Sequence, residues 1–177
     1  MYVAVDVQYA ADDTHATVAG VLFRDPVSDR VDDELIVVTS APKPYVPGHF
    51  YQRELPCILA LMNGITEPID TVFIDGYVDL GPKGGLGRHL YTSLNGDISV
   101  IGVAKRFFRE SSALEVKRGE SERPLFVTAV GLEVELAAKL VEEMHGPFRI
   151  PTLLKRADSL ARGKPTQSVK KGVTKDI

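Results

Sequence analysis

The spacing of apolar residues limits the fold of this 177-residue chain more than any other feature. Residues 2–8 alternate, with three valines on one side and Asp6 on the other, and this period of two predicts a strand with two different faces. Two more strands are predicted at 15–24 and 33–39, with turn-forming residues between them. The first part of the chain therefore predicts an antiparallel meander of three strands.

Helical and apolar segments alternate along the rest of the chain. A proline-rich stretch, APKPYVPG, separates the meander from the first of these segments and cannot be helical. We predict helices at 49–63, 86–93, 131–145 and 152–162, and strands at 70–75, 98–103 and 124–129. Pro56 predicts either a kink in the first helix or a helix that begins at Leu55–Pro56. This order of elements resembles the ribonuclease-H-like arrangement, in which helices flank a mixed sheet of three antiparallel strands followed by parallel strands.

Two polar stretches are predicted to lie outside the regular elements. Residues 109–123 are charged and predict a mobile excursion or a short hairpin, and residues 76–87 are a glycine-rich loop. We expect residues 1–163 to form one domain and residues 164–177, which are basic and almost free of apolar side chains, to be a disordered tail.

The charges are distributed unevenly, although the formal net charge is only −3. Residues 1–80 carry 4 Lys/Arg and 13 Asp/Glu, whereas residues 151–177 carry 7 and 2. Carboxylates suit a divalent cation and basic groups suit phosphate, so the pattern fits a metal-dependent nuclease, or an acidic surface followed by a basic tail. No apolar run approaches the roughly 20 residues of a membrane helix, and with a single cysteine we expect a cytoplasmic protein that is not bound to a membrane.

Three acidic residues on three different elements are the candidates for chemistry. Asp6 lies inside a strand, where a carboxylate is costly unless it has a partner, or else it points into water. Asp75 ends a buried strand, at the edge where ligands bind in α/β sheets, or it begins a turn. Glu54 lies in an apolar helical segment and could instead pair with Arg53 at the surface. Together the three could bind Mg²⁺, with Mn²⁺ as a substitute, because these ions take a few carboxylate oxygens along with water and phosphate.

Lys105 follows the strand at 98–103 and could stabilise charge on a phosphate, or be an exposed lysine at a strand end. The four histidines have no spacing typical of metal ligands. No Ser/His/Asp or Cys/His arrangement and no phosphate-binding GxxxxGK[ST] loop is present in the sequence.

Several motifs of the chain resemble endonuclease V, a family of metal-dependent nucleases that act near deaminated adenine in nucleic acid. The matching segments are VAVDVQY at 3–9, PYVPGHFYQRELP at 44–56, FIDGYVDLGPKGGLGRHL at 73–90, IGVAK at 101–105 and, more weakly, IPTLLKRADSLAR at 150–162. The resemblance implies Mg²⁺-dependent cleavage of a phosphodiester 3′ to hypoxanthine in DNA, one bond beyond the recognised base, by a protein that acts in repair, with RNA left open. We expect a monomer.

The resemblance also implies roles for individual residues. Asp6, Glu54 and Asp75 match the acids that bind the metal, and Lys105 matches the lysine beside the scissile phosphate. Tyr45 matches the wedge that replaces a flipped base, and Pro47 of the same motif is expected to bind substrate with it. Gly85, Gly87 and Gly102 match positions where the backbone approaches that base. Asp158 matches a position close to the metal.

The glycine-rich loop departs from the family pattern. Members usually carry a histidine–proline–arginine run where this chain has Gly81, Pro82 and Lys83. Lys83 could replace the charge of the arginine and bind substrate, without its bidentate geometry. A nucleic-acid-binding homologue with altered or lost cleavage is therefore the alternative to an active endonuclease.

Overall fold

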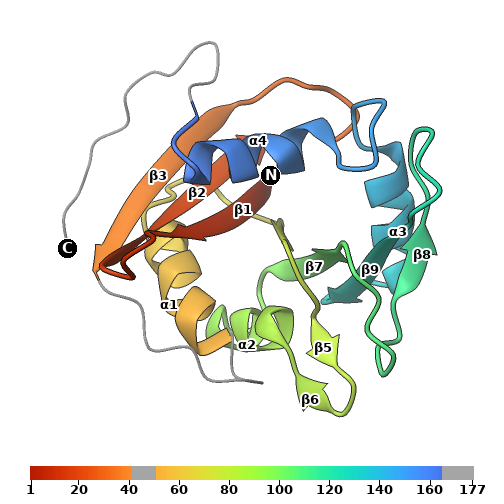
Figure 1. The fold of residues 1–177 in the computed structure, drawn as a ribbon, viewed down its shortest axis with the longest axis horizontal. Helices are drawn as coiled ribbons and strands as arrows, with labels where there is room; N and C mark the ends of the chain where they lie inside the picture. The colour runs from red at the N-terminus through yellow and green to blue at the C-terminus, as the bar shows by residue number, and fades with distance from the viewer. Residues whose placement is uncertain (41–50, 165–177) are drawn as a thin grey trace.

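The computed structural model describes residues 1–40 and 51–164, and within them one mixed sheet forms the centre of the molecule (Figure 1). Its strands are β1 (Tyr2–Tyr9), β2 (His15–Phe23), β3 (Asp33–Ser40), β4 (Thr71–Ile74), β7 (Ser99–Ala104), β8 (Leu114–Val116) and β9 (Leu125–Val130). They are hydrogen-bonded in the order β3-β2-β1-β4-β7-β9-β8. The sequence therefore predicted the main strands, and their order in space adds which of them are neighbours.

The strand directions confirm the predicted meander. β1 is antiparallel to β2, and β2 is antiparallel to β3. β4 then runs parallel to β1, and β7 runs parallel to β4, as expected for buried strands that are joined through helices. Beyond β7 the direction reverses, because β9 is antiparallel to β7 and β8 is antiparallel to β9. The mixed, ribonuclease-H-like fold class is thus confirmed.

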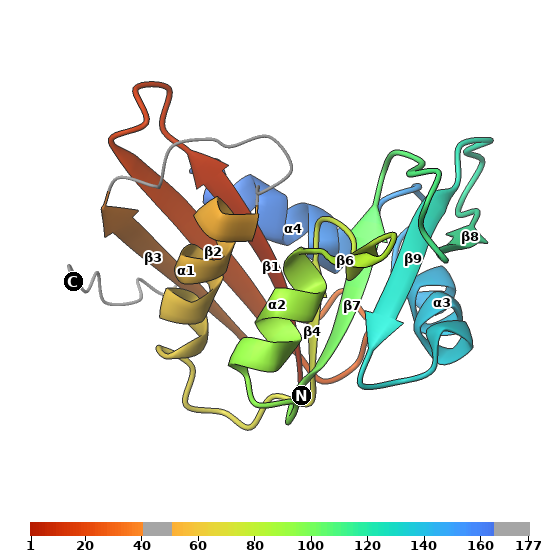
Figure 2. The same ribbon diagram turned by 90° about the horizontal axis from the view of Figure 1, so that it is seen from below.

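Helices cover both faces of this sheet (Figure 2). The helices are α1 (Tyr51–Met62), α2 (Leu86–Ser93), α3 (Val134–Glu143) and α4 (Thr152–Ala161). α1 and α2 pack on one face, where their side chains form an apolar cluster with alternate residues of β1, β4 and β7. α3 and α4 pack on the other face, with α4 against β1 and β2 and α3 against β8 and β9. The two faces therefore bury two separate apolar clusters.

Two expectations about local structure are corrected. α1 does not begin at Leu55–Pro56 but runs from Tyr51, with Pro56 inside the helix and exposed. A proline there removes one helical hydrogen bond, which the remaining apolar face of the helix outweighs. For residues 109–123 the expected excursion is wrong and the alternative of a hairpin is supported, because β8 lies within them, pairs antiparallel with the next strand β9 and forms the edge of the sheet.

The glycine-rich loop also contains regular structure, since β5 (Asp79–Leu80) and β6 (Lys83–Gly84) form a small antiparallel hairpin. The predicted tail at 164–177 lies, apart from Lys164, outside the described residues. Among the helices that are described, none combines the length and the apolar character needed to cross a membrane.

Candidate active site

Asp6 and Asp75 lie next to each other on two parallel strands, Asp6 inside β1 and Asp75 directly after β4. Val5 of β1 is in register with Ile74 of β4, so the two aspartates are the following residues on neighbouring strands. The side chain of Asp6 lies on the sheet face that α4 covers, because it alternates with the buried residues that pack against α1. Asp6 is half-buried, so the alternative that it simply points into water is excluded.

Glu54 approaches the two aspartates from the opposite layer, as part of α1. The three acidic residues line one small cavity of about 10 Å³, together with apolar side chains. This volume is close to that of a single water-sized sphere. The alternative role of Glu54, a surface pair with its neighbour Arg53, is excluded because Arg53 binds Asp13 with its guanidinium nitrogen 2.8 Å from the carboxylate oxygen.

Burial and nearby carboxylates raise the pKa values of Asp6 and Glu54. Burial raises the pKa of Asp6 from 3.8 to about 7, and the nearby carboxylates of Asp158 and Asp75 add to the rise. Burial likewise raises the pKa of Glu54 from 4.5 to about 8, with contributions from Asp6 and Asp75. Within residues 1–40 and 51–164, neither Asp6 nor Glu54 has a hydrogen-bond or ion-pair partner for its carboxylate. Lys105 pairs with Asp75 and partly offsets this charge, but no cation contacts the carboxylates of Asp6 and Glu54 in the described part of the chain.

This donor set suits a hard divalent cation, which prefers carboxylate oxygens. In the described part of the chain, however, no three His, Cys, Asp or Glu side chains form a group that could hold a metal ion as they stand. The shared cavity and the carboxylates of Asp6 and Glu54, which have no ion-pair partner in the described part of the chain, have the chemistry that suits a cation.

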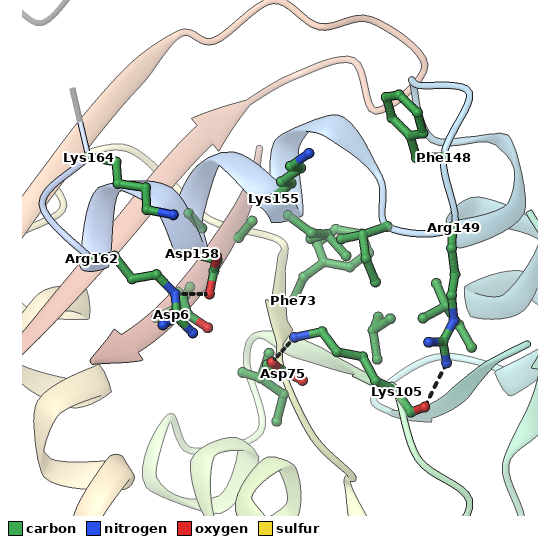
Figure 3. A pocket seen from close by; sticks show the side chains of 18 residues that line it. Asp6, Phe73, Asp75, Lys105, Phe148, Arg149, Lys155, Asp158, Arg162 and Lys164 are labelled. Atoms are coloured by element: carbon green, nitrogen blue, oxygen red, sulfur yellow. Dashed lines mark hydrogen bonds and ion pairs between the residues drawn. The ribbon is translucent and has the colours of Figure 1, made fainter. Parts of the chain in front are cut away.

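Lys105 and Asp158 complete the acidic site from two further elements (Figure 3). Lys105 follows β7 and forms an ion pair with Asp75, so it is not merely an exposed lysine at a strand end. Asp158, on α4, is near enough to Asp6 to raise its pKa and accepts a hydrogen bond of 2.8 Å from Arg162. The structure therefore brings Asp6, Asp75, Lys105 and Asp158 to one larger pocket of about 670 Å³ beside α4.

Packing within the chain explains why glycine occupies the three predicted positions. A Cβ atom on Gly102 would lie 2.5 Å from the carbonyl oxygen of Gly76, and one on Gly85 would lie 2.8 Å from that of Tyr77. A Cβ atom on Gly87 would meet the side chain of Val78 at 2.8 Å. All three glycines are buried, so internal packing explains them, and contact with an extruded base stays a prediction.

The structure gives less information about the other residues that we predict to bind substrate. Lys83 lies in β6, in the hairpin that follows Asp79. Tyr45 and Pro47 lie outside the described residues. Their roles remain predictions.

Sequence reasoning missed the residues at the far end of the larger pocket. Phe148 and Arg149 belong to the connection between α3 and α4, which has no periodic pattern that would mark it. Arg149 donates hydrogen bonds to the backbone oxygens of Lys105 at 2.6 Å and Pro124 at 2.7 Å, which ties this connection to the end of β7. A signal was available for Arg162, because it follows Asp158 by one helical turn.

Comparisons with known proteins agree on one family. A family model described as Endonuclease V matches residues 1–134. An endonuclease V of Streptomyces avermitilis is 33% identical over 181 aligned residues, which cover 89% of this chain and 77% of that protein.

Solved structures are similar over 92% of this chain. The crystal structure of an endonuclease V from Streptomyces avermitilis has a TM-score of 0.76 and 26% identity, with 79% of that chain covered. The crystal structure of Ciona intestinalis endonuclease V, in complex with a 24mer DNA that contains an inosine followed by a ribo-adenosine, has a TM-score of 0.75. At 21% identity, over 84% of that chain, this second likeness concerns the fold alone.

Proposed function

The chain belongs to the endonuclease V family, and from this premise we propose that it cleaves the phosphodiester 3′ to a deaminated adenine base in DNA. Membership makes it a nuclease that hydrolyses phosphodiester bonds with the help of a metal ion. Beyond this, we propose that the recognised base is hypoxanthine and that the metal is Mg²⁺. The inosine-containing DNA bound by the Ciona intestinalis protein supports the choice of base.

The observation that carries the proposal is the convergence of Asp6, Glu54 and Asp75 on one small cavity. They come from β1, from α1 and from the residue after β4, so distant parts of the sequence supply them. Two of these carboxylates, Asp6 and Glu54, are half-buried and have no cation in contact with them among the described residues, which is energetically costly. Ionisable groups in such costly surroundings cluster at functional sites.

These three residues are the ones that would hold Mg²⁺, with Mn²⁺ as a substitute. The bound ion would supply a Lewis acid for the phosphate and would lower the pKa of a water molecule that attacks it. At neutral pH without metal, the raised pKa values keep Asp6 and Glu54 partly protonated. Metal binding should therefore release protons, and affinity for the metal should increase with pH.

We propose that Lys105 acts on the phosphate. Its ammonium group pairs with the carboxylate of Asp75, and both side chains are exposed at the mouth of the larger pocket. Once a cation neutralises Asp75, the ammonium group is free to donate to a phosphate oxygen and to stabilise the charge that builds up there. Asp158 does not need to bind metal for this role, since its carboxylate is held by Arg162 beside Asp6.

A second candidate function is nucleic-acid binding with altered or lost cleavage. Two observations favour it. Among the described residues no three potential ligands are already grouped to hold a metal ion, and Lys105 is paired with Asp75. For either function we propose that residues 1–163 act as one unit, as a cytoplasmic monomer, with RNA as a second target. The two apolar clusters on the faces of a single sheet support the single unit.

The test is the cleavage of a DNA oligonucleotide that contains one hypoxanthine, beside the same strand with adenine and beside an RNA strand with inosine. We expect a nick 3′ to hypoxanthine that leaves 3′-hydroxyl and 5′-phosphate ends, in Mg²⁺ and not in chelator. Equal nicking of the adenine strand would refute the base specificity. Binding of the hypoxanthine strand without any nick, in Mg²⁺ and in Mn²⁺, would favour the second candidate.

A further inference from the structure

The larger pocket extends well beyond the acidic residues. One end holds Asp6, Asp158, Arg162 and Lys164, and the other end holds Phe148 and Arg149, with Phe73 between them (Figure 3). Its volume of about 670 Å³ is in the range of pockets that bind small organic groups. A metal ion and one phosphate at the acidic end would leave most of this space unexplained.

The part of the pocket away from the acids is apolar. Its lining consists of side chains from the core cluster under α4 and from the α3–α4 connection: Phe73, Val103, Leu125, Ile150 and Leu154. Phe73 and Leu125 are fully buried, so the half-buried Ile150 and Leu154 form most of the surface that a ligand could cover. Such a surface does not compensate a phosphate for the water it would lose, whereas the flat apolar face of a base can cover it. The lining therefore selects the base of a nucleotide and not its phosphate.

The pocket carries five cations, and among the described residues three of them have no acidic partner: Arg149, which donates to backbone oxygens instead, and two lysines. Lys105 is paired with Asp75, and Arg162 is paired with Asp158. Lys155 and Lys164 have no ion pair with any residue in 1–40 or 51–164. These two ammonium groups are free to meet the phosphates of a strand that crosses the rim.

Phe148 stands at the lip of the apolar part. Its side chain is 65% exposed, and the ammonium group of Lys155 lies 5.4 Å from the centre of its ring. An exposed aromatic ring beside a free cation is the combination that single-stranded nucleic acids stack on.

The backbone that carries Phe148 is held firmly, although its ring is exposed. Arg118 is buried and donates hydrogen bonds to the carbonyl oxygens of Phe148 at 2.9 Å and of Arg149 at 3.4 Å. It also donates to three further carbonyls between residues 142 and 146. The ring is therefore presented from a fixed position, which lowers the conformational entropy that a ligand has to overcome.

We propose that this pocket binds one unstacked nucleobase of the strand that is cut, with the base on the apolar lining and against Phe148. The neighbouring phosphates meet Lys155 and Lys164. The inference rests on the proposed nuclease function and deepens it, because it adds a second base-binding site to the one implied for the deaminated base. It also makes single-stranded or locally opened nucleic acid the preferred substrate, since the base has to leave its stack.

The test measures the affinity of a fluorescently labelled single-stranded DNA that contains one hypoxanthine, in chelator so that it is not cut. The intact strand is compared with strands that lack one base in turn. We expect one position, other than the hypoxanthine, at which removal of the base weakens binding to the wild-type protein about tenfold. At that position Phe148→Ala should bind intact and abasic strands almost equally, because the ring and the base act as one pair.

Exposed residues on α3 supply matched controls. Leu136→Ala removes another exposed apolar side chain, and Lys139→Ala removes another exposed lysine, in each case away from the pocket. Both should keep the tenfold effect of the abasic position, whereas Lys155→Ala should weaken binding of every strand. Leu154→Phe, which fills the pocket without removing a contact at the lip, should abolish the effect as Phe148→Ala does.

Failure of this inference and failure of the nuclease function give different results. If the protein nicks DNA but no abasic position other than the hypoxanthine weakens binding, the second base site is refuted and the nuclease stands. If an abasic position weakens binding through Phe148 but no strand is ever nicked, the base site is supported and the nuclease function falls. An equal effect of the abasic position in wild type and Phe148→Ala would also refute the site.

Discussion

Replacement of Asp6 by asparagine tests whether the acidic cluster is as costly as the structure indicates. The change removes one charge and keeps the shape of the side chain. Burial and the neighbouring carboxylates raise the pKa of Asp6 from 3.8 to about 7, a rise of about three units. Each unit corresponds to ~1.4 kcal/mol, and the charge is shared with Glu54, so we expect the metal-free variant to gain about 2–4 kcal/mol at pH 8.

The gain should depend on pH in a defined direction. Between pH 4 and pH 7 the folded protein keeps a proton on Asp6 that the unfolded chain has released, so the free energy of unfolding of the wild type falls as pH rises. Near pH 4, close to the ordinary pKa of 3.8, the unfolded chain also holds much of this proton, and the advantage of Asp6→Asn should shrink to below about 1 kcal/mol. The raised pKa of Glu54 also makes the free energy of unfolding fall as pH rises, and the Asp6→Asn variant retains this contribution.

Urea denaturation in chelator, at pH 4 and at pH 8, measures both quantities. Saturating Mg²⁺ at pH 8 should then stabilise the wild type, by about 2.7 kcal/mol at a hundred times Kd, and should stabilise the variant much less. Asp97→Asn, which changes an exposed acid in the turn after α2, is the control and should alter stability by less than ~0.5 kcal/mol. The reasoning is refuted if Asp6→Asn is no more stable than the wild type at pH 8, or if its advantage is the same at both pH values.

Three further substitutions have expected outcomes. Arg118→Ala removes five hydrogen bonds to backbone carbonyls and should cost about 3–5 kcal/mol of unfolding free energy in urea; a loss below about 1 kcal/mol would contradict this. Gly102→Ala would place a Cβ atom 2.5 Å from the oxygen of Gly76 and 2.7 Å from Oγ1 of Thr128, and we expect a loss of about 1–3 kcal/mol and a lower Tm, not an unchanged one. Lys105→Met should lower the nicking rate about a hundredfold but leave Mg²⁺ affinity equal or tighter, because its aspartate loses a competing cation; a parallel loss of both would place the lysine in metal binding.

The sequence predicted the acidic site better than the pocket around it. Alternation in β1 places Asp6 on one face of the sheet, and the apolar run of β4 places Asp75 at its end, so local patterns are enough to locate both. That Glu54 meets them from α1 follows from the packing of a helix over the end of the sheet, which no local pattern contains. The motifs shared with the family grouped Glu54 with the two aspartates, and the cavity that all three line supports this grouping.

The pocket could not be predicted, because irregular backbone forms its far end. Phe148 and Arg149 lie between two helices, in a connection held by Arg118 from a segment that looks only polar in sequence. Their position depends on hydrogen bonds to backbone carbonyls, and such bonds leave no periodic signal. The same holds for the reversal of direction at β9, since an antiparallel and a parallel buried strand have the same apolar composition.

The glycines illustrate a different difficulty. Gly102 is predicted to contact a base because a missing side chain permits close approach, and the structure shows a close approach of the backbone at Gly76. Contact with a base stays a prediction. A glycine in a sequence can indicate that another group approaches the backbone closely, but it does not identify that group.

The most direct measurement of the central claim is the rate at which a hypoxanthine-containing DNA strand is nicked, as a function of Mg²⁺ concentration, by three proteins. Wild type and Asp97→Asn should nick at the same rate, since Asp97 is exposed and lies outside both cavities of the site. Asp75→Asn should nick at least about a hundredfold more slowly, because a metal ligand is lost. Equal rates for Asp75→Asn and the wild type would contradict the proposed metal site.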